Sequence, residues 1–551
     1  MSNISGFLRR KVYVALVVIT LLAAFIRFYK IAEIPVSLYW DEVSIGYNAY
    51  SIGMTGRDEF GTFTPLLFKA FNDYKMPLDI YLTVLSEKAF GLDEFSVRFP
   101  SAFFGTLTVL VAFFLVRQLL ITSSKKTKLP IDSFALLTSL MLAISPWHIQ
   151  FSRANFEANI SLFFVVLGAY FLLKGRESFK SYVFSFLSFA FAFYGYRSEF
   201  LFLPILILGI HLIWFRRYIM HGYQKIILVI FLFSLLLVPI FMPLTRQGAS
   251  RYQQTSLSNK VEQVALDNFQ KGRPVNKKVL YISTFLEGYV SEFTPQFLFL
   301  TGDPEGRHSA RNMGMLYLWE FPFVFLGGWF IFKKTSRKIF YTILLWILAA
   351  PIPAALSIPT PHALRSLNIL PLPQLLTALG VIYIMTILPK FMKKPFIAVL
   401  SVIVLIFFVN FTRQYILTNT KLVVSNWGDG YKQLVRTIKA RENKYGTIII
   451  TGHYWQPYTY FLFYENFSPD NFQKTGNSEH FGKYIFGGTS WDLAVGRPEL
   501  SDVDLKVLAG NGKALVALSP DDYKAQEENL GYLTTIRDNN GKTVFIVGEL
   551  K

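Results

Sequence analysis

Long apolar runs alternate with polar stretches of different lengths along the chain up to residue 411. A helix that crosses a bilayer needs about 17 to 25 mostly apolar residues, and about eleven runs approach that length. The runs lie at residues 12–28, 99–120, 133–147, 158–173, 181–195, 199–215, 225–243, 314–332, 339–357, 366–388 and 394–411. This pattern predicts an α-helical polytopic membrane protein with about eleven transmembrane helices.

The tail of the chain, from residue 413 onward, has a different pattern. Short β-branched runs are typical of strands, and they alternate with segments of helical spacing. We expect strands at 446–451, 514–518 and 543–547, a helix at 430–441, an aromatic helix or strand at 458–464, and a hairpin turn at 538–541. This alternation predicts a small α/β domain at residues 413–551, after a transmembrane domain at residues 1–412.

The composition excludes several classes of protein. Of the 551 residues, 52% are hydrophobic and only 17% are charged, which is typical of polytopic membrane proteins and not of soluble folds. The absence of cysteine excludes disulfides, cysteine-ligated metals and a thiol nucleophile. We expect the net charge of +19 to face anionic lipid headgroups rather than nucleic acid, because membrane proteins collect lysine and arginine in cytoplasmic loops.

Basic residues predict the orientation, because lysine and arginine near the ends of spans resist translocation. Residues 9–11 are Arg-Arg-Lys and indicate a cytoplasmic N-terminus. Each later loop on the same side is also basic, and these loops contain Lys125 and Lys126, residues 174–180, Arg216 and Arg217, residues 333–338 and residues 390–394. The extracytoplasmic face then receives the loops 33–98, 145–159 and 244–312 and the C-terminal domain.

The first outer loop carries two candidate segments. Asp41 and Glu42 are adjacent carboxylates just outside the first span, and charges that face a cavity at a membrane surface are functional candidates. Lys75 precedes Met76 and Pro77 and is suited to pair with a lipid phosphate, although a lysine that only snorkels to the headgroups is the alternative. The amphipathic character of residues 33–98 predicts helices along the interface.

Several short motifs, taken in order, resemble a known family. They are Trp40-Asp41-Glu42 with Gly46-Tyr47, Lys75-Met76-Pro77-Leu78, Ser96 to Ser101, Ser145 to Arg153, and Pro361 to Arg365 followed by Leu370 to Pro373. The chain resembles the GT-C glycosyltransferases that use polyprenyl-phosphate sugars, especially the group of protein O-mannosyltransferases and lipid A aminoarabinose transferases. Met76 departs from that group's Lys-Pro-Pro-Leu pattern.

The resemblance implies an inverting glycosyltransferase that moves a sugar from a polyprenyl phosphate to an acceptor hydroxyl on the outer face of the membrane. Such a reaction needs a base on the acceptor and cations on the departing phosphate. Asp41 is the candidate base, and we expect Glu42 to position the acceptor or the helix. The alternative for Asp41 is the N-cap of a helix over residues 42–50.

The resemblance also assigns contacts to the substrates. The candidate contacts of the donor phosphate are Lys75, Arg153, Arg365 and Arg197. Lipid headgroup contacts or loop ion pairs are the alternatives for the arginines. The candidate substrate-binding residues are Tyr47, Glu157, His362, Arg307 and His308. The last two lie in a turn-rich stretch, residues 301–308, that is either a lid over the donor or a plain connector.

The sequence gives little support to a metal. Related enzymes often carry a further aspartate in the second outer loop, where this chain has Glu157. His148, Glu157 and His362 lack the spacing of a zinc site. We therefore predict no metal ligands and no particular cofactor. A bound divalent metal remains the alternative.

Two other classes of protein compete with the enzyme hypothesis. A transporter or flippase of lipid-linked saccharides would show internal repeats and broken spans at mid-membrane, and we find no repeat in this chain. A noncatalytic scaffold would not need its candidate charges to converge on one cavity.

The expected partners are a polyprenyl-phosphate sugar, membrane lipids, and an acceptor protein, glycolipid or polymer, and the expected location is the bacterial inner membrane. The sequence identifies neither the sugar nor the acceptor.

Overall fold

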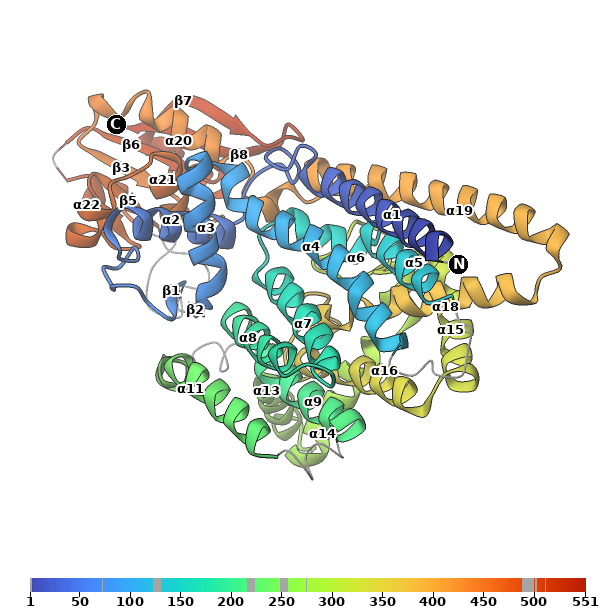
Figure 1. Cartoon of the computed structure of the whole chain (residues 1–551). Coiled ribbons are helices and arrows are strands. Elements are labelled where there is room, and N and C mark those ends of the chain that lie inside the picture. The colour runs from blue at the N-terminus through green and yellow to red at the C-terminus, as the bar shows by residue number, and fades with distance from the viewer. Residues whose placement is uncertain are drawn as a thin grey trace. The chain divides into compact units, whose positions relative to one another are not determined.

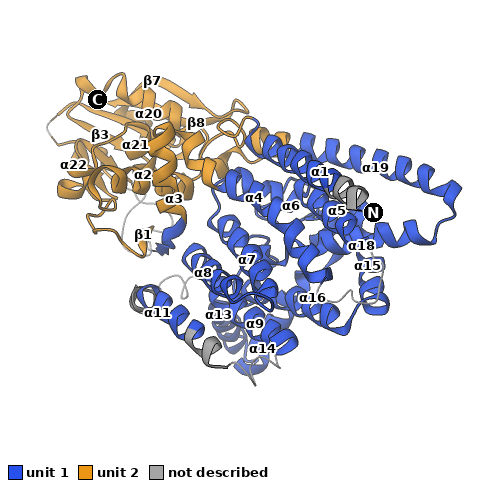
Figure 2. Ribbon diagram, viewed as in Figure 1, with its two compact units in different colours: residues 1–29, 72–78, 101–415 blue, residues 30–71, 79–100, 416–551 orange. Residues whose placement is uncertain are grey.

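The chain forms two compact units, and the computed structural model describes residues 2–71, 73–121, 130–215, 223–247, 256–273, 275–487, 500, 503–510 and 512–551. Unit 1 comprises Met1–Tyr29, Asn72–Leu78 and Ser101–Tyr415, and unit 2 comprises Lys30–Phe71, Asp79–Pro100 and Ile416–Lys551 (Figure 2). Most of the first outer loop thus falls into the same unit as the tail. The domain boundary after residue 412 stays a prediction, and the basic residues 125–126 and 216–217 lie outside the described residues.

Unit 1 is built from helices (Figure 1). They are α1 (Ser2–Phe28), α5 (Ile131–Ala143), α6 (Pro146–Arg153), α7 (Glu157–Lys174), α8 (Phe179–Gly195), α9 (Glu199–Ile210), α11 (Tyr223–Gln247), α13 (Leu257–Gln270), α14 (Lys277–Ser291), α15 (Phe321–Lys334), α16 (Arg337–Ala349), α17 (Ile352–Ala355), α18 (Leu372–Ile387), and most of α4 (Glu94–Ile121) and α19 (Lys390–Leu417). Each apolar run predicted from the sequence contains at least one helix.

Not all of these helices are long enough to cross a membrane. Within the described ranges, six helical segments are long and apolar enough, and a seventh span results if the bent pair α5 and α6 counts as one. The six are Arg10–Phe28, Glu94–Ile121, Glu157–Lys174, Arg337–Ala355, Leu367–Ile387 and Lys390–Leu422. Helices α8, α9 and α15 have only 17, 12 and 14 residues. The estimate of about eleven spans is too high by this criterion, because several apolar runs fold into shorter helices.

Glycines allow two helices of unit 1 to approach closely. A Cβ atom on Gly327 of α15 would lie 2.0 Å from the carbonyl oxygen of Leu376 on α18. A Cβ atom on Gly380 of α18 would lie 2.2 Å from the carbonyl oxygen of Phe323 on α15. Small residues at such contacts let helix backbones pack directly, as is common in membrane bundles. Side chains larger than glycine at either position would push the two helices apart.

Unit 2 combines helices with a six-stranded sheet. Its helices are α2 (Trp40–Thr55), most of α3 (Pro77–Phe90), α20 (Tyr431–Lys439), α21 (Pro457–Tyr464), α22 (Pro469–Thr475), α23 (Leu505–Ala509) and α24 (Pro520–Gln526). The sheet contains β4 (His480–Phe481), β5 (Tyr484–Phe486), β3 (Thr447–Ile450), β6 (Ala514–Leu518), β8 (Thr543–Leu550) and β7 (Leu530–Arg537), in that order. Strand β3 is parallel to β5 and β6, and the other neighbours are antiparallel.

The structure confirms the strands predicted in the tail. β6 and β8 cover two of the predicted runs, β3 lies within the third, and α20 lies within the predicted helix. Residues 458–464 are helical, as part of α21. The apolar core of unit 2 also includes Val43 and Tyr47 of α2, which pack with tail residues such as Tyr458 and Phe461. The tail therefore shares its core with part of the first outer loop.

Candidate functional site

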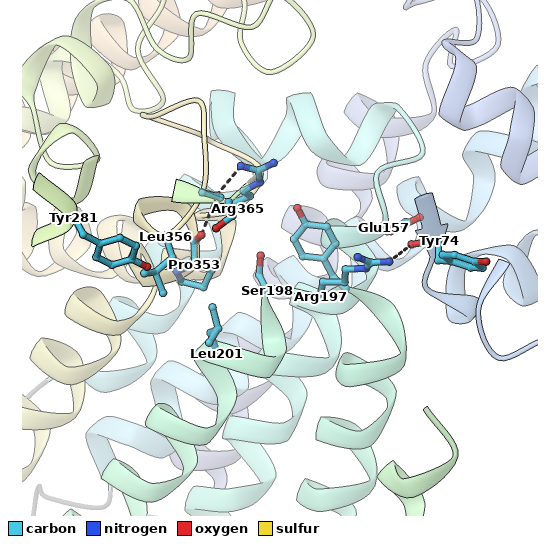
Figure 3. A pocket seen from close by; sticks show the side chains of 12 residues that line it. Tyr74, Glu157, Arg197, Ser198, Leu201, Tyr281, Pro353, Leu356 and Arg365 are labelled. Atoms are coloured by element: carbon cyan, nitrogen blue, oxygen red, sulfur yellow. Dashed lines mark hydrogen bonds between the residues drawn. The ribbon is translucent and has the colours of Figure 1, made fainter. Parts of the chain in front are cut away.

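A cavity of about 400 Å³ within unit 1 brings together side chains from distant parts of the sequence. Its lining includes Tyr74, Glu157, Arg197, Ser198, Tyr281 and Arg365 (Figure 3). Glu157 begins α7, Arg197 lies between α8 and α9, and Arg365 follows α17. Three residues singled out in the sequence therefore meet at one cavity.

Arg197 connects the cavity wall to the segment of Lys75. Its Nη2 donates a 2.5 Å hydrogen bond to the carbonyl oxygen of Tyr74 (Figure 3) and lies 3.3 Å from Asp73 Oδ1. The Arg197 side chain is 21% exposed, so it is partly open to the cavity. Lys75 is buried at the end of β2 (Asp73–Lys75), directly after the cavity-lining Tyr74.

Arg365 is fixed by the segment that follows α17. Its Nη1 donates hydrogen bonds to Ser357 Oγ at 2.6 Å and to the carbonyl oxygen of Ile358 at 2.9 Å. Ser357 also lines the cavity, and its backbone pairs with Ser256 in an isolated β-bridge. These contacts hold the guanidinium at the cavity wall while the Arg365 side chain stays partly exposed.

A buried hydrogen-bond network joins the two segments that carry the arginines. Glu199 Oε1 accepts hydrogen bonds from Ser161 Oγ at 2.8 Å and from Asn368 Nδ2 at 2.9 Å. Glu199 follows Arg197 by two positions, and Asn368 follows Arg365 by three. Because a fully hydrogen-bonded buried network is rigid, it fixes the positions of the two arginines relative to each other.

The charges and hydroxyl groups of the cavity suit an anion. Guanidinium groups bind phosphate oxygens through strong, often bidentate hydrogen bonds. Among the described lining residues there are two arginines and one carboxylate, that of Glu157. The side chains of Tyr74, Ser198 and Tyr281 add hydroxyl groups that can donate hydrogen bonds. The arrangement is chemically able to hold a phosphate group.

Arg153 does not line this cavity, in contrast to the expectation from the sequence. Its Nη1 donates to the carbonyl oxygen of Ile26 at 2.5 Å, and its Nη2 to that of Tyr29 at 2.7 Å. Its guanidinium also packs over the ring of Tyr415, 5.4 Å from the centroid. The last carbonyls of a helix lack partners within the helix. Arg153 therefore caps the end of α1.

Asp41 and Glu42 lie in the first turn of α2, in unit 2. The N-cap of α2 is Tyr39, so the alternative role of Asp41 as N-cap is wrong. Glu42 is buried, and its Oε1 accepts a 2.9 Å hydrogen bond from Arg98 Nε while its Oε2 accepts one from the Tyr39 amide at 3.2 Å. Glu42 thus positions the helix. Asp41 is partly exposed, and its role as base stays a prediction.

The structure corrects the assignment of Tyr47 as a substrate contact. Tyr47 is fully buried in the core of unit 2. Its hydroxyl donates to the carbonyl oxygen of Phe467 at 3.1 Å, and its ring packs edge-on against Phe472. A side chain with no exposed surface contributes to packing rather than to ligand contact. The Gly46-Tyr47 motif therefore indicates a helix that packs in the core of unit 2.

Arg307, His308 and His362 also lie in unit 1, but none of them is among the described residues that line the cavity. Arg307 Nε pairs with Glu305 Oε1 at 3.0 Å. His308 Nδ1 lies 3.0 Å from Asp303 Oδ2, and the His308 and His362 rings have centroids 4.9 Å apart. The predicted substrate contacts on this loop are therefore paired with neighbouring side chains.

Comparisons with known proteins agree on one fold. The sequence profile of the family described as dolichyl-phosphate-mannose-protein mannosyltransferase matches residues 17–251. The structure of ArnT from Cupriavidus metallidurans bound to undecaprenyl phosphate is similar with a TM-score of 0.59 and 14% identity, over 98% of this chain and 97% of that chain. The chain has the GT-C fold, and its residues 17–251 are similar to the protein mannosyltransferase family.

A second GT-C structure is similar to this chain. Archaeal oligosaccharyltransferase AglB from Archaeoglobus fulgidus, in complex with an inhibitory peptide and a dolichol-phosphate, has a TM-score of 0.53 and 12% identity. The similarity covers 98% of this chain and 74% of that chain. No curated protein sequence matches the chain significantly.

The match to the family model covers only part of the candidate site residues of this GT-C protein. Residues 17–251 contain Asp41, Lys75 and Arg197, whereas Arg365 lies beyond them. The sequence did not single out Glu199 or Asn368 as site residues. For Glu199 a signal existed, because it is a carboxylate in a short polar turn between two apolar runs. The importance of Asn368 depends on its tertiary contact with Glu199, which no local pattern indicates.

Proposed function

We propose that this GT-C protein is an inverting glycosyltransferase that moves a sugar from a polyprenyl-phosphate donor to an acceptor hydroxyl. The observation that carries the proposal is the convergence of Arg197 and Arg365 on one cavity (Figure 3). The presence of undecaprenyl phosphate or dolichol-phosphate in structures of similar fold supports a lipid phosphate as the carrier of the sugar.

The proposed reaction uses the two arginines on the leaving group. The acceptor oxygen forms a bond to the anomeric carbon while the bond from that carbon to the phosphate oxygen breaks. The polyprenyl phosphate leaves with the bonding electron pair, so negative charge grows on its oxygens. Arg197 and Arg365 stabilise this charge, because donors held in place before the reaction lower its barrier. Attack from the opposite side inverts the anomeric configuration.

Asp41 is the proposed base. Its carboxylate accepts the proton of the acceptor hydroxyl as the new carbon–oxygen bond forms. The partial exposure of Asp41 in the first turn of α2 is compatible with this role. Lys75 is a further proposed contact of the donor phosphate, and Glu157 and Arg307 are further proposed substrate contacts.

We further propose that the reaction takes place on the extracytoplasmic face of a bacterial inner membrane, with the N-terminus in the cytoplasm and the tail outside. The basic residues 333–338, between the apolar parts of α15 and α16, support this orientation.

A transfer assay with the purified full-length chain and a panel of polyprenyl-phosphate sugars tests the proposal. We expect Asp41→Asn to abolish transfer and Arg197→Ala to lower kcat at least about 100-fold. Arg337→Ala, at an exposed position that begins α16, serves as the matched control and keeps the wild-type rate. Transfer that is unchanged in Asp41→Asn and Arg197→Ala would refute the assignment of these residues.

Mass spectrometry of lipid-linked sugars from cells with and without the gene identifies the donor. The donor accumulates when the gene is absent, and the missing glycosylated product names the acceptor. A flippase would instead move the lipid-linked sugar across a vesicle membrane without forming a new glycosidic bond. Movement without transfer in reconstituted vesicles would therefore replace the enzyme proposal with a transporter.

A further inference from the structure

Three buried side chains of unit 1 form a cluster outside the arginine-lined cavity. Asp303 and His308 come from the turn-rich segment before η3 (Leu318–Glu320), and His362 comes from the segment before η4 (Leu367–Ile369). One possible ligand atom of each residue lies within 4.8 Å of the other two. Their exposed fractions are only 5%, 6% and 8%. The fold thus collects one carboxylate and two imidazoles in a largely dry setting.

The geometry of the cluster fits a small cation. His308 Nδ1 lies 3.0 Å from Asp303 Oδ2, and the rings of His308 and His362 are tilted by 42° with centroids 4.9 Å apart. Ligands bound to zinc at about 2.0 to 2.1 Å in tetrahedral geometry lie about 3.3 Å from one another. One pair already has this spacing, and the other pairs must close by no more than about 1.5 Å.

We propose that Asp303, His308 and His362 bind a divalent transition-metal cation of the zinc class. Two imidazole donors favour zinc over Mg²⁺ and Ca²⁺, which prefer oxygen ligands. Phe151 and Phe156 pack against the His308 ring, with centroids 5.5 Å and 5.9 Å away, and so shield this side of the site from water. The inference does not depend on the proposed transferase activity.

Hydrogen bonds around the cluster support a site that holds two segments together. Asp303 Oδ2 accepts the amide of Ala363 at 2.7 Å, and Glu292 Oε1 accepts the amide of His362 at 2.7 Å. Glu292 is 1% exposed, and within the described part of the chain its Oε2 has no hydrogen-bond partner. A further carboxylate oxygen is thus present beside His362. Because Arg365 lies three residues after His362, the cation restrains the segment that presents this arginine to the cavity.

Metal analysis of the full-length chain, purified in detergent without a polyhistidine tag, tests the proposal. After exposure to Zn²⁺ and removal of excess metal, we expect about one zinc per chain by mass spectrometry, as for a single three-ligand site. His308→Gln and His362→Gln each weaken zinc binding at least about tenfold. His480→Gln, which changes an exposed histidine of β4, is the matched control and keeps wild-type binding. Mg²⁺ and Ca²⁺ at the same concentration do not displace the zinc.

Several results would overturn the proposal. They are wild-type protein without stoichiometric zinc, equal binding in the two ligand variants, and displacement of the metal by Mg²⁺. If a ligand variant does not fold, the absorption spectrum of Co²⁺-loaded wild-type protein decides, because ligand-field bands report the coordination geometry directly. Intense bands of a tetrahedral nitrogen and oxygen site support the proposal, and their absence contradicts it. The metal readouts stay valid even if no sugar transfer is found.

Discussion

Arginine has different roles in the two units of this protein. In unit 2, Arg98 is fully buried and donates to both carboxylate oxygens of Glu42, at 2.9 Å and 3.1 Å, and to three backbone carbonyl oxygens. In unit 1, Arg365 donates to Ser357 and Ile358 but stays partly exposed at a cavity wall. Both arginines belong to motifs that resemble the same enzyme group, yet only Arg365 is open to a ligand.

The difference shows how to separate structural charges from chemical ones. A buried charge is tolerated when the protein itself uses its hydrogen-bonding capacity. Arg98 and Glu42 meet this condition, so their conspicuous place in the motifs indicates a stabilising pair. A partly exposed arginine at a cavity wall can exchange water for an anion without breaking a buried pair. Exposure and surroundings, rather than the motif alone, therefore distinguish the two roles.

Replacing Arg98 with alanine tests the structural side of this comparison and has the largest expected effect. The change leaves the Glu42 carboxylate buried without its cation, which costs about 3 to 5 kcal/mol in the free energy of unfolding. Denaturant unfolding monitored by the tryptophans measures the loss. The double variant Arg98→Met with Glu42→Leu should recover most of it, because no uncompensated charge remains. A single variant as stable as the wild type would show that the pair does not stabilise unit 2.

Replacing Arg365 with alanine tests the chemical side. We expect kcat/KM for lipid-phosphate sugar to fall about 100-fold, because one donor to the leaving phosphate is lost. Arg365→Lys should lose about tenfold, since lysine keeps the charge but not the planar pair of donors. The thermal unfolding midpoint should change little in both variants. A large loss of stability with unchanged turnover would place Arg365 in the same structural class as Arg98.

The sequence predicted the fold well where a local pattern is sufficient. Apolar runs located most helices of unit 1 but not α6, α13 and α14, which lie in the predicted outer loops. β-Branched runs located β3, β6 and β8. The two-residue strand β4 and the three-residue strand β5 are too short to give an alternating pattern. Helix lengths were also missed, because an apolar run does not specify where tertiary contacts end a helix. The core that α2 shares with the tail was also missed, because it depends on tertiary contacts between segments far apart in the sequence.

The candidate site was predicted in part. Glu157, Arg197 and Arg365 could be selected because charges are rare beside apolar spans, and the structure brings all three to one cavity. Arg153 has the same sequence character, yet it hydrogen-bonds to carbonyls at the end of α1. A single sequence does not distinguish these outcomes, because side-chain type and position are alike. The contribution of Asp303 to the cluster likewise depends on a contact with His308 from a folded turn.

Glu87 sharpens the comparison, because it is a buried carboxylate in a different setting from Glu42. Burial, and to a smaller extent the nearby Asp93, raises the pKa of Glu87 from 4.5 to about 9. Because its pKa is raised, the Glu87 carboxyl group binds its proton more tightly in the folded state than in the unfolded state. The protonated group therefore contributes stability that is fully present below pH 4.5 and is lost as the pH rises through about 9. Glu87→Gln removes the titration and should make the protein more stable than the wild type at pH 8 by about 1 to 2 kcal/mol. Thermal unfolding at pH 5 and pH 8 measures this, and a variant difference that is independent of pH would contradict it.

Replacing Asn368 with alanine has the smallest expected effect and tests whether the arginines depend on their support. The change removes the hydrogen bonds from Asn368 Nδ2 to Glu199, at 2.9 Å and 3.0 Å, and leaves Ser161 as a donor to this carboxyl group. We expect a loss of about 1 kcal/mol in stability, typical of one buried hydrogen-bonding group. Because Arg197 and Arg365 lose their fixed separation, kcat should fall several-fold while the KM for the donor changes less. Asn368→Gln provides the matched variant, since it keeps the amide but shifts its position. If turnover in Asn368→Ala follows only the fraction of folded protein, the network supports the fold and not the geometry of the site.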